Sequence, residues 1–192
     1  RGEYQRFYYA QGRLFFYHTY WADQSGYRLH AKDDEGFSKL YACPWTPDED
    51  GGVDLARATV ITLPVVGEVP FSFGQLGREV LTCSNIGGVY VFGGEAWRTA
   101  VEAEIDTSYQ VYSMINFYDR LLLGQYPTGL LFEYSGDQVT PIEGWPPKMP
   151  GVSSSVREAQ TTAIYGGDLF VGVGPWAELW RYNPDTDGWT FV

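Results

Sequence analysis

Cysteine and long apolar runs are scarce in this chain, and both scarcities exclude classes of protein. The two cysteines, Cys43 and Cys83, form no CxxC pair and no metal-binding spacing, so neither a disulfide framework nor a zinc site is indicated. We expect two buried free thiols, with a bridge between them as the alternative. No apolar run approaches the length of a membrane span, so no membrane partner is expected.

Basic residues are also few. The chain has 24 acidic and 13 basic residues, and its formal net charge of -11 repels the phosphate backbone of nucleic acids. DNA and RNA are therefore not expected as partners. Only Lys32, Lys39 and Lys148 are lysines, and a few of the remaining arginines in a cleft can still bind an acidic ligand through bidentate contacts.

Helical periodicity is absent as well. Aromatic residues make up 17% of the chain, and 23 glycines and 11 prolines interrupt it. Aromatic residues favour strands, whereas glycine and proline favour turns, so the composition predicts an all-β chain. The chain begins "RGEYQRF" without Met or a signal-peptide apolar region, so we expect a processed, truncated or excised start. An extracellular or periplasmic location is weakly favoured, but export cannot be inferred from this start.

A repeat runs through the sequence. The stretches "LLLGQYPTGLLFEY" (121–134) and "LFVGVGPWAELWRY" (169–182) align without a gap. They share five positions: Leu121/Leu169, Gly124/Gly172, Pro127/Pro175, Leu131/Leu179 and Tyr134/Tyr182. Each copy follows the same order of four short alternating strands separated by turn residues, which is typical of half-buried antiparallel strands.

Four copies cover the chain, at about 3–46, 60–104, 107–145 and 156–192, and we predict that they form one domain over 1–192. In the first copy the expected strands are 3–10, 13–20, 27–33 and 38–45, and "DLARATV" (54–60) forms at most a short turn before the second copy. Four-stranded units of roughly 40 to 50 residues are typical of β-propellers. The predicted fold is therefore an all-β propeller of about four four-stranded antiparallel blades, either complete or a sector of a larger propeller with missing blades.

This pattern resembles the β-propeller superfamily over nearly the whole chain, although the WD dipeptide of WD40 repeats and the Asp-box of sialidases are absent. In a propeller, the loops that join second to third strands and those that lead into first strands gather on one face, where we expect ligand-binding residues. The rim residues expected there are His18, Tyr20, Trp21, Gln125, Tyr126 and Trp176, with Tyr109, Tyr112, Arg157 and Gln160 leading into first strands. Aromatic faces beside fixed polar groups suit carbohydrate rings.

The only two histidines flank the turn "ADQSGY". In a hairpin centred near Gln24, His18 and His30 would lie almost opposite each other, where side chains can touch. Such a pair can act as general base or acid beside a substrate carboxylate, with a Tyr and an Arg completing the site. The alternative is that both are structural histidines bonded to their neighbours.

The histidine pair resembles the propeller-fold polysaccharide lyases that act on uronate polymers, such as the ulvan lyases, which carry paired histidines on one blade and Tyr and Arg on following blades. The resemblance implies β-elimination, with His18 and His30 as base and neutralising group and Tyr109 or Tyr112 as acid. In the family pattern the arginine lies near the end of the strand that follows the tyrosine strand. Arg157 lies at a different point in the strand order.

The main hypothesis is a carbohydrate-active propeller, either lyase-like or a binding module, whose partner is an acidic polysaccharide or oligosaccharide. No cofactor and no metal are expected, because the acidic clusters at 33–35 and 48–50 lack the ligand spacing of a calcium loop. The segment "NPDTDG" (183–188) is interpreted as an ordinary hairpin turn. The alternative is a non-catalytic propeller that serves as a protein-interaction scaffold.

Overall fold

The computed structural model describes residues 1–20, 36–47, 51–153 and 155–192. These residues form two compact units, unit 1 over Arg1–Thr107 and unit 2 over Ser108–Val192, and each unit contains two four-stranded antiparallel sheets. No helix in these ranges is long and apolar enough to cross a membrane.

Unit 1 contains sheets 1 and 2. The strands of sheet 1 are β1 (Glu3–Ala10), β2 (Arg13–Tyr20), β3 (Phe37–Pro44) and β4 (Thr59–Thr62), and those of sheet 2 are β5 (Pro70–Leu76), β6 (Glu79–Ser84), β7 (Val89–Phe92) and β8 (Trp97–Val101). A short 3-10 helix, η1 (Leu55–Arg57), precedes β4.

Unit 2 contains sheets 3 and 4. The strands of sheet 3 are β9 (Gln110–Phe117), β10 (Arg120–Tyr126), β11 (Leu131–Tyr134) and β12 (Val139–Pro141), and those of sheet 4 are β13 (Glu158–Tyr165), β14 (Asp168–Gly174), β15 (Glu178–Asn183) and β16 (Gly188–Phe191).

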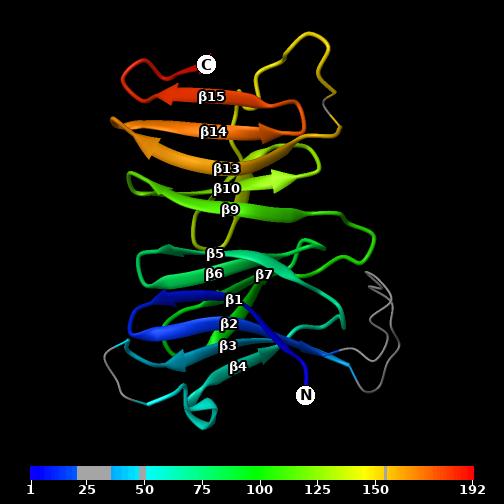
Figure 1. Cartoon of the computed structure of the whole chain (residues 1–192), viewed down its shortest axis with the longest axis vertical. Helices are drawn as coiled ribbons and strands as arrows, with labels where there is room; N and C mark the ends of the chain where they lie inside the picture. Colours follow the sequence, from blue (N-terminus) through cyan, green and yellow to red (C-terminus); the bar gives the residue numbers. More distant parts are fainter. Residues whose placement is uncertain (21–35, 48–50, 154) are drawn as a thin grey trace. The chain divides into compact units, whose positions relative to one another are not determined.

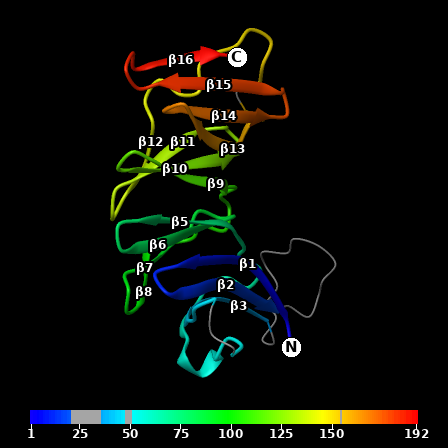
Figure 2. The ribbon, with the colours of Figure 1, turned by 60° about the vertical axis from the view of Figure 1, so that its left-hand side comes forward.

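Each sheet is a meander in which the strands pair with their neighbours in chain order, as Figures 1 and 2 show. Four consecutive four-stranded meanders are the blades of a β-propeller. The predicted fold class is therefore confirmed, and the described residues are almost entirely strand and turn.

The first sheet differs from the predicted strand order. The segment 38–45 was expected to be the last strand of its blade, but β3 pairs with β2 on one side and with β4 on the other, so the sheet ends at Thr62 and not near 46. The prediction missed β4 because it has only four residues, which leaves two for each face and little alternation. The predicted strand 27–33 lies outside the described residues.

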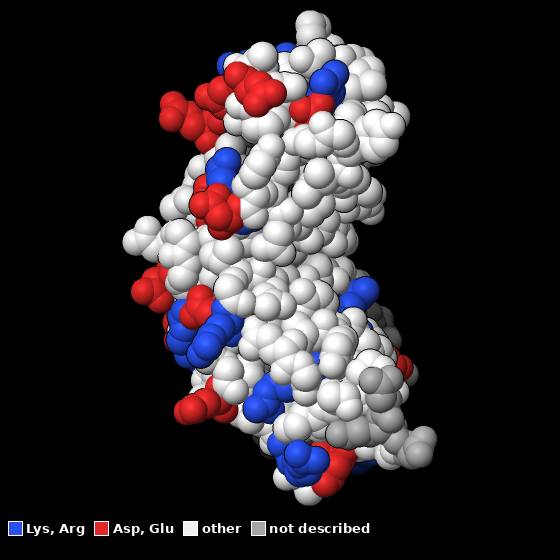
Figure 3. Space-filling model, turned by 90° about the vertical axis from the view of Figure 1, so that its left-hand side faces the viewer, with Lys and Arg blue, Asp and Glu red and all other residues white. Residues whose placement is uncertain are grey.

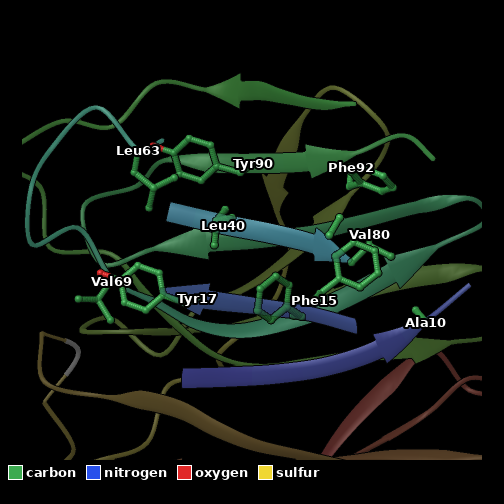
Figure 4. Packing of buried hydrophobic residues seen from close by; sticks show 11 residues of the cluster. Ala10, Phe15, Tyr17, Leu40, Leu63, Val69, Val80, Tyr90 and Phe92 are labelled. Atoms are coloured by element: carbon green, nitrogen blue, oxygen red, sulfur yellow. The ribbon is translucent and has the colours of Figure 1, made fainter. Parts of the chain in front are cut away.

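The core of unit 1 forms where sheets 1 and 2 pack face to face. Alternate residues such as Phe15 and Tyr17 on β2 point into this core, together with Tyr90 and Phe92 on β7 (Figure 4). The rings of Phe15 and Phe92 meet edge to face at 5.5 Å. Because successive side chains of a strand point to opposite faces, the spacing of two residues builds this core.

The core of unit 2 is built around tryptophans. Trp145, which follows β12, packs against Trp180 at 6.2 Å and Trp189 at 4.3 Å between ring centroids. Its indole N–H donates to the Gly129 carbonyl at 2.8 Å, so the buried polar atom is satisfied. Leu169 and other apolar residues of sheet 4 complete this core with residues of sheet 3.

The two cysteines are buried and free, as expected from the sequence. Burial raises the pKa of the Cys83 thiol to about 12, so this thiol stays protonated at neutral pH. Cys43 donates to the Asp54 carbonyl at 3.1 Å. Both therefore behave as small core residues.

The repeat has the same register in both copies. Leu121 pairs with Tyr134 in sheet 3, and Leu169 pairs with Tyr182 in sheet 4. The surroundings of the shared glycine differ between the two copies. A Cβ at Gly124 would lie only 2.1 Å from the Ala159 carbonyl oxygen. The strands β10 and β13 approach too closely there for any side chain.

We expect Gly124→Ala to destabilise the protein by more than about 2 kcal/mol, because backbone must move to admit the methyl group. The matched control is Gly172→Ala, where the nearest atom, the Thr161 Cβ, would be 3.6 Å away. Its free energy of unfolding should change by less than about 1 kcal/mol. Chemical denaturation of the full chain measures both, and equal effects would contradict this role of Gly124.

Candidate functional site

His18 lies on β2 among aromatic rings. It stacks on Tyr4 at 4.1 Å and meets the edge of Phe37 at 4.8 Å. Its Nε2 lies 3.1 Å from the Arg1 carbonyl oxygen, which can only accept, so Nε2 carries the hydrogen of the neutral ring. The side chain is 8% exposed, and burial lowers its pKa below the usual 6.5. His18 is therefore a neutral member of an aromatic layer.

Of the other site residues predicted on the first blade, the structure describes only Tyr20. His30 and Trp21 lie outside the described residues, so the paired arrangement of His18 and His30 stays a prediction. Tyr20 packs against Phe37 at 6.2 Å, and the Arg1 guanidinium lies 3.9 Å from the centre of the Tyr20 ring.

In unit 2 the structure brings several predicted residues together. Tyr112 meets Tyr126 edge to face at 6.2 Å, and the Tyr112 hydroxyl donates to Gln110 at 2.6 Å. Gln125 is 3% exposed; its amide donates to the Tyr126 carbonyl, and its Oε1 accepts from Thr128 at 2.6 Å. These polar groups bind one another at the end of β10.

Arg157 joins the same end of unit 2 but is bound by a carboxylate of its own unit. Its Nε donates to Glu178 Oε1 at 3.0 Å, and its Nη2 donates to Glu178 Oε2. The Trp180 indole donates to the same Oε2 at 2.8 Å. The Arg157 and Glu178 side chains are 4% and 2% exposed, so this bidentate pair is buried.

The remaining predicted site residues of unit 2 are Tyr109, Gln160 and Trp176. Tyr109 meets Phe132 edge to face at 5.3 Å, and Gln160 is exposed on β13. Trp176 is 46% exposed and donates to the Val156 carbonyl at 3.1 Å. At this end of unit 2 the structure thus offers a hydrogen-bonded framework whose arginine is already bound.

Sequence reasoning missed a pocket at the other end of unit 2. It has a volume of about 350 Å³ and is lined by Phe117, Arg120, Leu122, Ile142, Glu143, Gly144, Leu169, Tyr182, Asp187 and Trp189. These residues lie on β9, β10, β14, β15 and β16 near their turns, in the segment after β12, and in the β15–β16 turn. We call it the unit 2 pocket.

Three aromatic rings form walls of the unit 2 pocket. Tyr182 meets Phe117 at 6.0 Å with an angle of 74° between the rings, and it meets Trp189 at 5.0 Å with an angle of 45°. Because the contacting rings are inclined to one another, they form one wall that presents both ring faces and ring edges. The sequence showed these residues as strand aromatics, but nothing in it placed the β9–β10 turn beside the turn 183–188.

The charged groups of the unit 2 pocket are partly paired. Arg120 donates through Nε and Nη2 to Glu133 Oε2 at 2.9 and 2.7 Å, and this hydrogen bonding raises the pKa of Arg120. The Tyr182 hydroxyl donates to Asp187 Oδ1 at 2.7 Å, and that bond raises the pKa of Tyr182. The turn 183–188 therefore supplies a pocket carboxylate as well as a chain reversal.

A buried acid lies in unit 1. Glu68 is 0% exposed; its Oε1 accepts from the Tyr90 hydroxyl at 2.6 Å, and its Oε2 has no hydrogen-bond partner among the described residues. Burial raises its pKa above 4.5, hydrogen bonds from Ser84 and Tyr90 oppose the rise, and Glu102 adds to it. Gly88 makes room for this cluster, because a Cβ there would lie 2.5 Å from Glu68 Oε1.

In the described part of the chain, no group of three His, Cys, Asp or Glu side chains is placed so that it could hold a metal ion. This finding applies to the ranges given above and not to residues 21–35, 48–50 and 154.

Comparison with known proteins gives structural likenesses only. No protein-family model and no curated protein matches the sequence. The fold is similar to a crystal structure of HIRA residues 644–1017, with 9% identity, a TM-score of 0.44 and coverage of 99% of this chain and 53% of that one. It is also similar to YCF48 bound to D1 peptide, with 10% identity, a TM-score of 0.47 and coverage of 100% and 53%.

This chain spans about half the length of each of these two structures. At this level of similarity, no function carries over from either protein. The comparisons give no support to the expected resemblance to ulvan lyases.

The buried acid makes a pH-dependent prediction. Glu68→Gln keeps an oxygen for the Tyr90 hydroxyl but removes the charge. A carboxyl whose folded pKa is raised stabilises the fold below its unfolded value, near 4.5, and this stability is lost as pH rises through the folded pKa. The variant should therefore have a higher free energy of unfolding than the parent at pH 8, and the gain should disappear below about pH 4.5.

Denaturant titrations at several pH values measure this gain. The matched control is Glu95→Gln, an exposed glutamate of unit 1. The same gain with the same pH profile in the control would contradict the assignment to Glu68.

The buried ion pair makes a second prediction. Arg157→Met leaves the Glu178 carboxylate buried without its cation and should cost about 3 to 5 kcal/mol. The double variant Arg157→Met/Glu178→Gln should lose less, because the buried charge is gone while an acceptor for Trp180 remains.

Arg98→Met is the matched control, since Arg98 and Glu79 form a 2.9 Å pair with side chains 38% and 30% exposed. It should cost less than about 1 kcal/mol. Denaturation of the three variants would refute the structural role of Arg157 if Arg157→Met were no worse than the control.

Proposed function

We propose that this chain is a non-catalytic β-propeller module that binds a protein partner through the unit 2 pocket. The observation that carries the proposal is the pocket itself, an aromatic and apolar hollow of about 350 Å³ between turns, with a few charged groups among its lining residues. A hollow of this kind accepts an anchoring side chain of a partner, which is how most binding energy is concentrated at protein interfaces.

The lining residues lack the side chains that usually serve acyl transfer. They include no Ser, Thr, Cys, His or Lys, and the Tyr182 hydroxyl is bound to Asp187. Nucleophilic catalysis requires a nucleophile within hydrogen-bond reach of a base that activates it. The composition of the pocket therefore does not indicate acyl transfer, and its aromatic and apolar lining supports binding.

The carbohydrate-lyase hypothesis has weaker support. Arg157 would have to leave Glu178 before it could neutralise a substrate carboxylate. That step would leave the buried Glu178 carboxylate without its cation. His18 would have to leave an aromatic stack to act as a base. An acidic polymer would also meet a chain of net charge -11.

Selection of a displayed random-peptide library on the immobilised protein tests the proposal. We expect enrichment of peptides with a shared anchor residue, and we expect Trp189→Leu to abolish it because a wall of the pocket is removed. Thermal unfolding checks that the variant is folded.

The matched control is Trp176→Leu, which alters an exposed tryptophan at the other end of unit 2 and should retain the enriched peptides. Retention by Trp189→Leu, or binding to a glycan array without any enriched peptide, would contradict the proposal.

A further inference from the structure

The geometry of the unit 2 pocket points to its ligand, an alkylammonium group: the side chain of a lysine, free or methylated, in a basic segment of the partner. This inference rests on the proposed function and adds the chemistry of the anchor. Aromatic walls accept a neutral apolar side chain as well as a cation, and the carboxylates beside these walls favour the cation.

The aromatic walls suit a cation. Tyr182 contacts Phe117 and Trp189 at centroid distances of 6.0 and 5.0 Å and with angles of 74° and 45°, so the three rings form one continuous aromatic wall and a group in the pocket lies beside it. A cation within about 6 Å of a ring centroid is attracted by the negative face of the ring, with a gain that grows when water is excluded. An alkylammonium group combines an apolar stem for Leu122 and Leu169 with a charge for the rings.

The carboxylates of the unit 2 pocket favour the same sign of charge. Glu143 follows β12 and Asp187 lies in the β15–β16 turn, so two acidic side chains line the pocket from separate segments. The one basic lining residue, Arg120, is held by Glu133 through two donors. The pocket and this bound glutamate together carry three carboxylates and one guanidinium, so an anionic anchor would be repelled.

The net negative charge of the chain favours a partner segment that is basic. With a formal net charge of -11 and an isoelectric point near 4.5, the protein attracts a basic segment at long range. Figure 3 faces the side of the molecule that carries strand turns, and it shows several red Asp and Glu side chains in the upper part, with some blue Lys and Arg side chains beside them. A lysine in such a segment meets first the acidic surface and then the aromatic hollow.

An NMR titration of the full chain tests the assignment by following the Trp189 indole N–H. The probes are the N-acetyl amides of lysine, trimethyl-lysine, arginine and norleucine, and norleucine keeps the apolar stem without the ammonium group. We expect saturable shifts with lysine or trimethyl-lysine and at least about tenfold weaker binding of norleucine. Tighter binding of trimethyl-lysine would identify a methylated source, and tighter binding of lysine an unmodified one.

Isosteric variants locate the charge effect. Glu143→Gln and Asp187→Asn should each weaken lysine binding by about threefold or more, because each removes one pocket carboxylate. Asn also accepts the Tyr182 hydroxyl and tolerates the positive φ of 48° at position 187. Asp185→Asn is the matched control, since it removes the same charge from the same turn outside the pocket lining, and its loss should be smaller.

Norleucine binding as tight as lysine binding, arginine binding tighter than both lysine forms, or no shift with any cation would each overturn the inference. If peptides were still enriched through Trp189 in the library selection, the protein-binding function would stand without the cation. If that selection failed as well, the proposed function itself would be wrong.

Discussion

Face-to-face packing of four-stranded sheets is the interaction on which each unit depends. A single meander of this size cannot bury its apolar face alone and needs a second layer. In unit 1, Phe15 and Tyr17 are buried in a cluster that includes Phe73 of β5 and Phe92 of β7 from the opposite sheet. In unit 2, the same requirement brings β10 and β13 so close that Gly124 has no room for a Cβ.

Close packing also explains why polar side chains at the strand ends are hydrogen-bonded to one another. When apolar faces close, a polar group at their border loses water and must find a partner. Arg157 finds Glu178 and Gln125 finds Thr128, so groups that resemble a ligand site in the sequence form a framework. Glu68 Oε2 and His18 Nδ1 are the exceptions, since neither buried atom has a hydrogen-bond partner among the described residues.

The unit 2 pocket arises where this packing ends. Strands β9 and β10, and strands β15 and β16, are joined by turns. Phe117 belongs to the buried core of unit 2, Tyr182 and Trp189 are partly buried against that core, and all three rings line the pocket near these turns. Polar turn residues such as Asp187 are near because a chain reversal favours Asp and Gly. An aromatic hollow with carboxylates beside it is thus a consequence of ending an aromatic core at a hairpin turn.

Local pattern in the sequence was sufficient for most of the fold. Alternation and turn residues indicated four strands in each of the copies that form sheets 2, 3 and 4, and the repeated Leu, Gly and Tyr positions indicated the common register of β10 with β11 and of β14 with β15. The pattern failed for β4, which is too short to alternate visibly. It also predicted that Tyr112, Gln125, Tyr126 and Arg157 lie near one another, but not that they are bonded within their own unit.

By itself, the sequence determined the blade type, the strand order within most sheets and the acidic character, because each depends on composition or on spacing within a few residues. Only the tertiary structure decided which charges are paired and where the aromatic hollow lies. Arg157 meets Glu178 across 21 positions of sequence, and Phe117 meets Tyr182 across two sheets. Such contacts depend on how separate segments pack, and local periodicity carries no information about that.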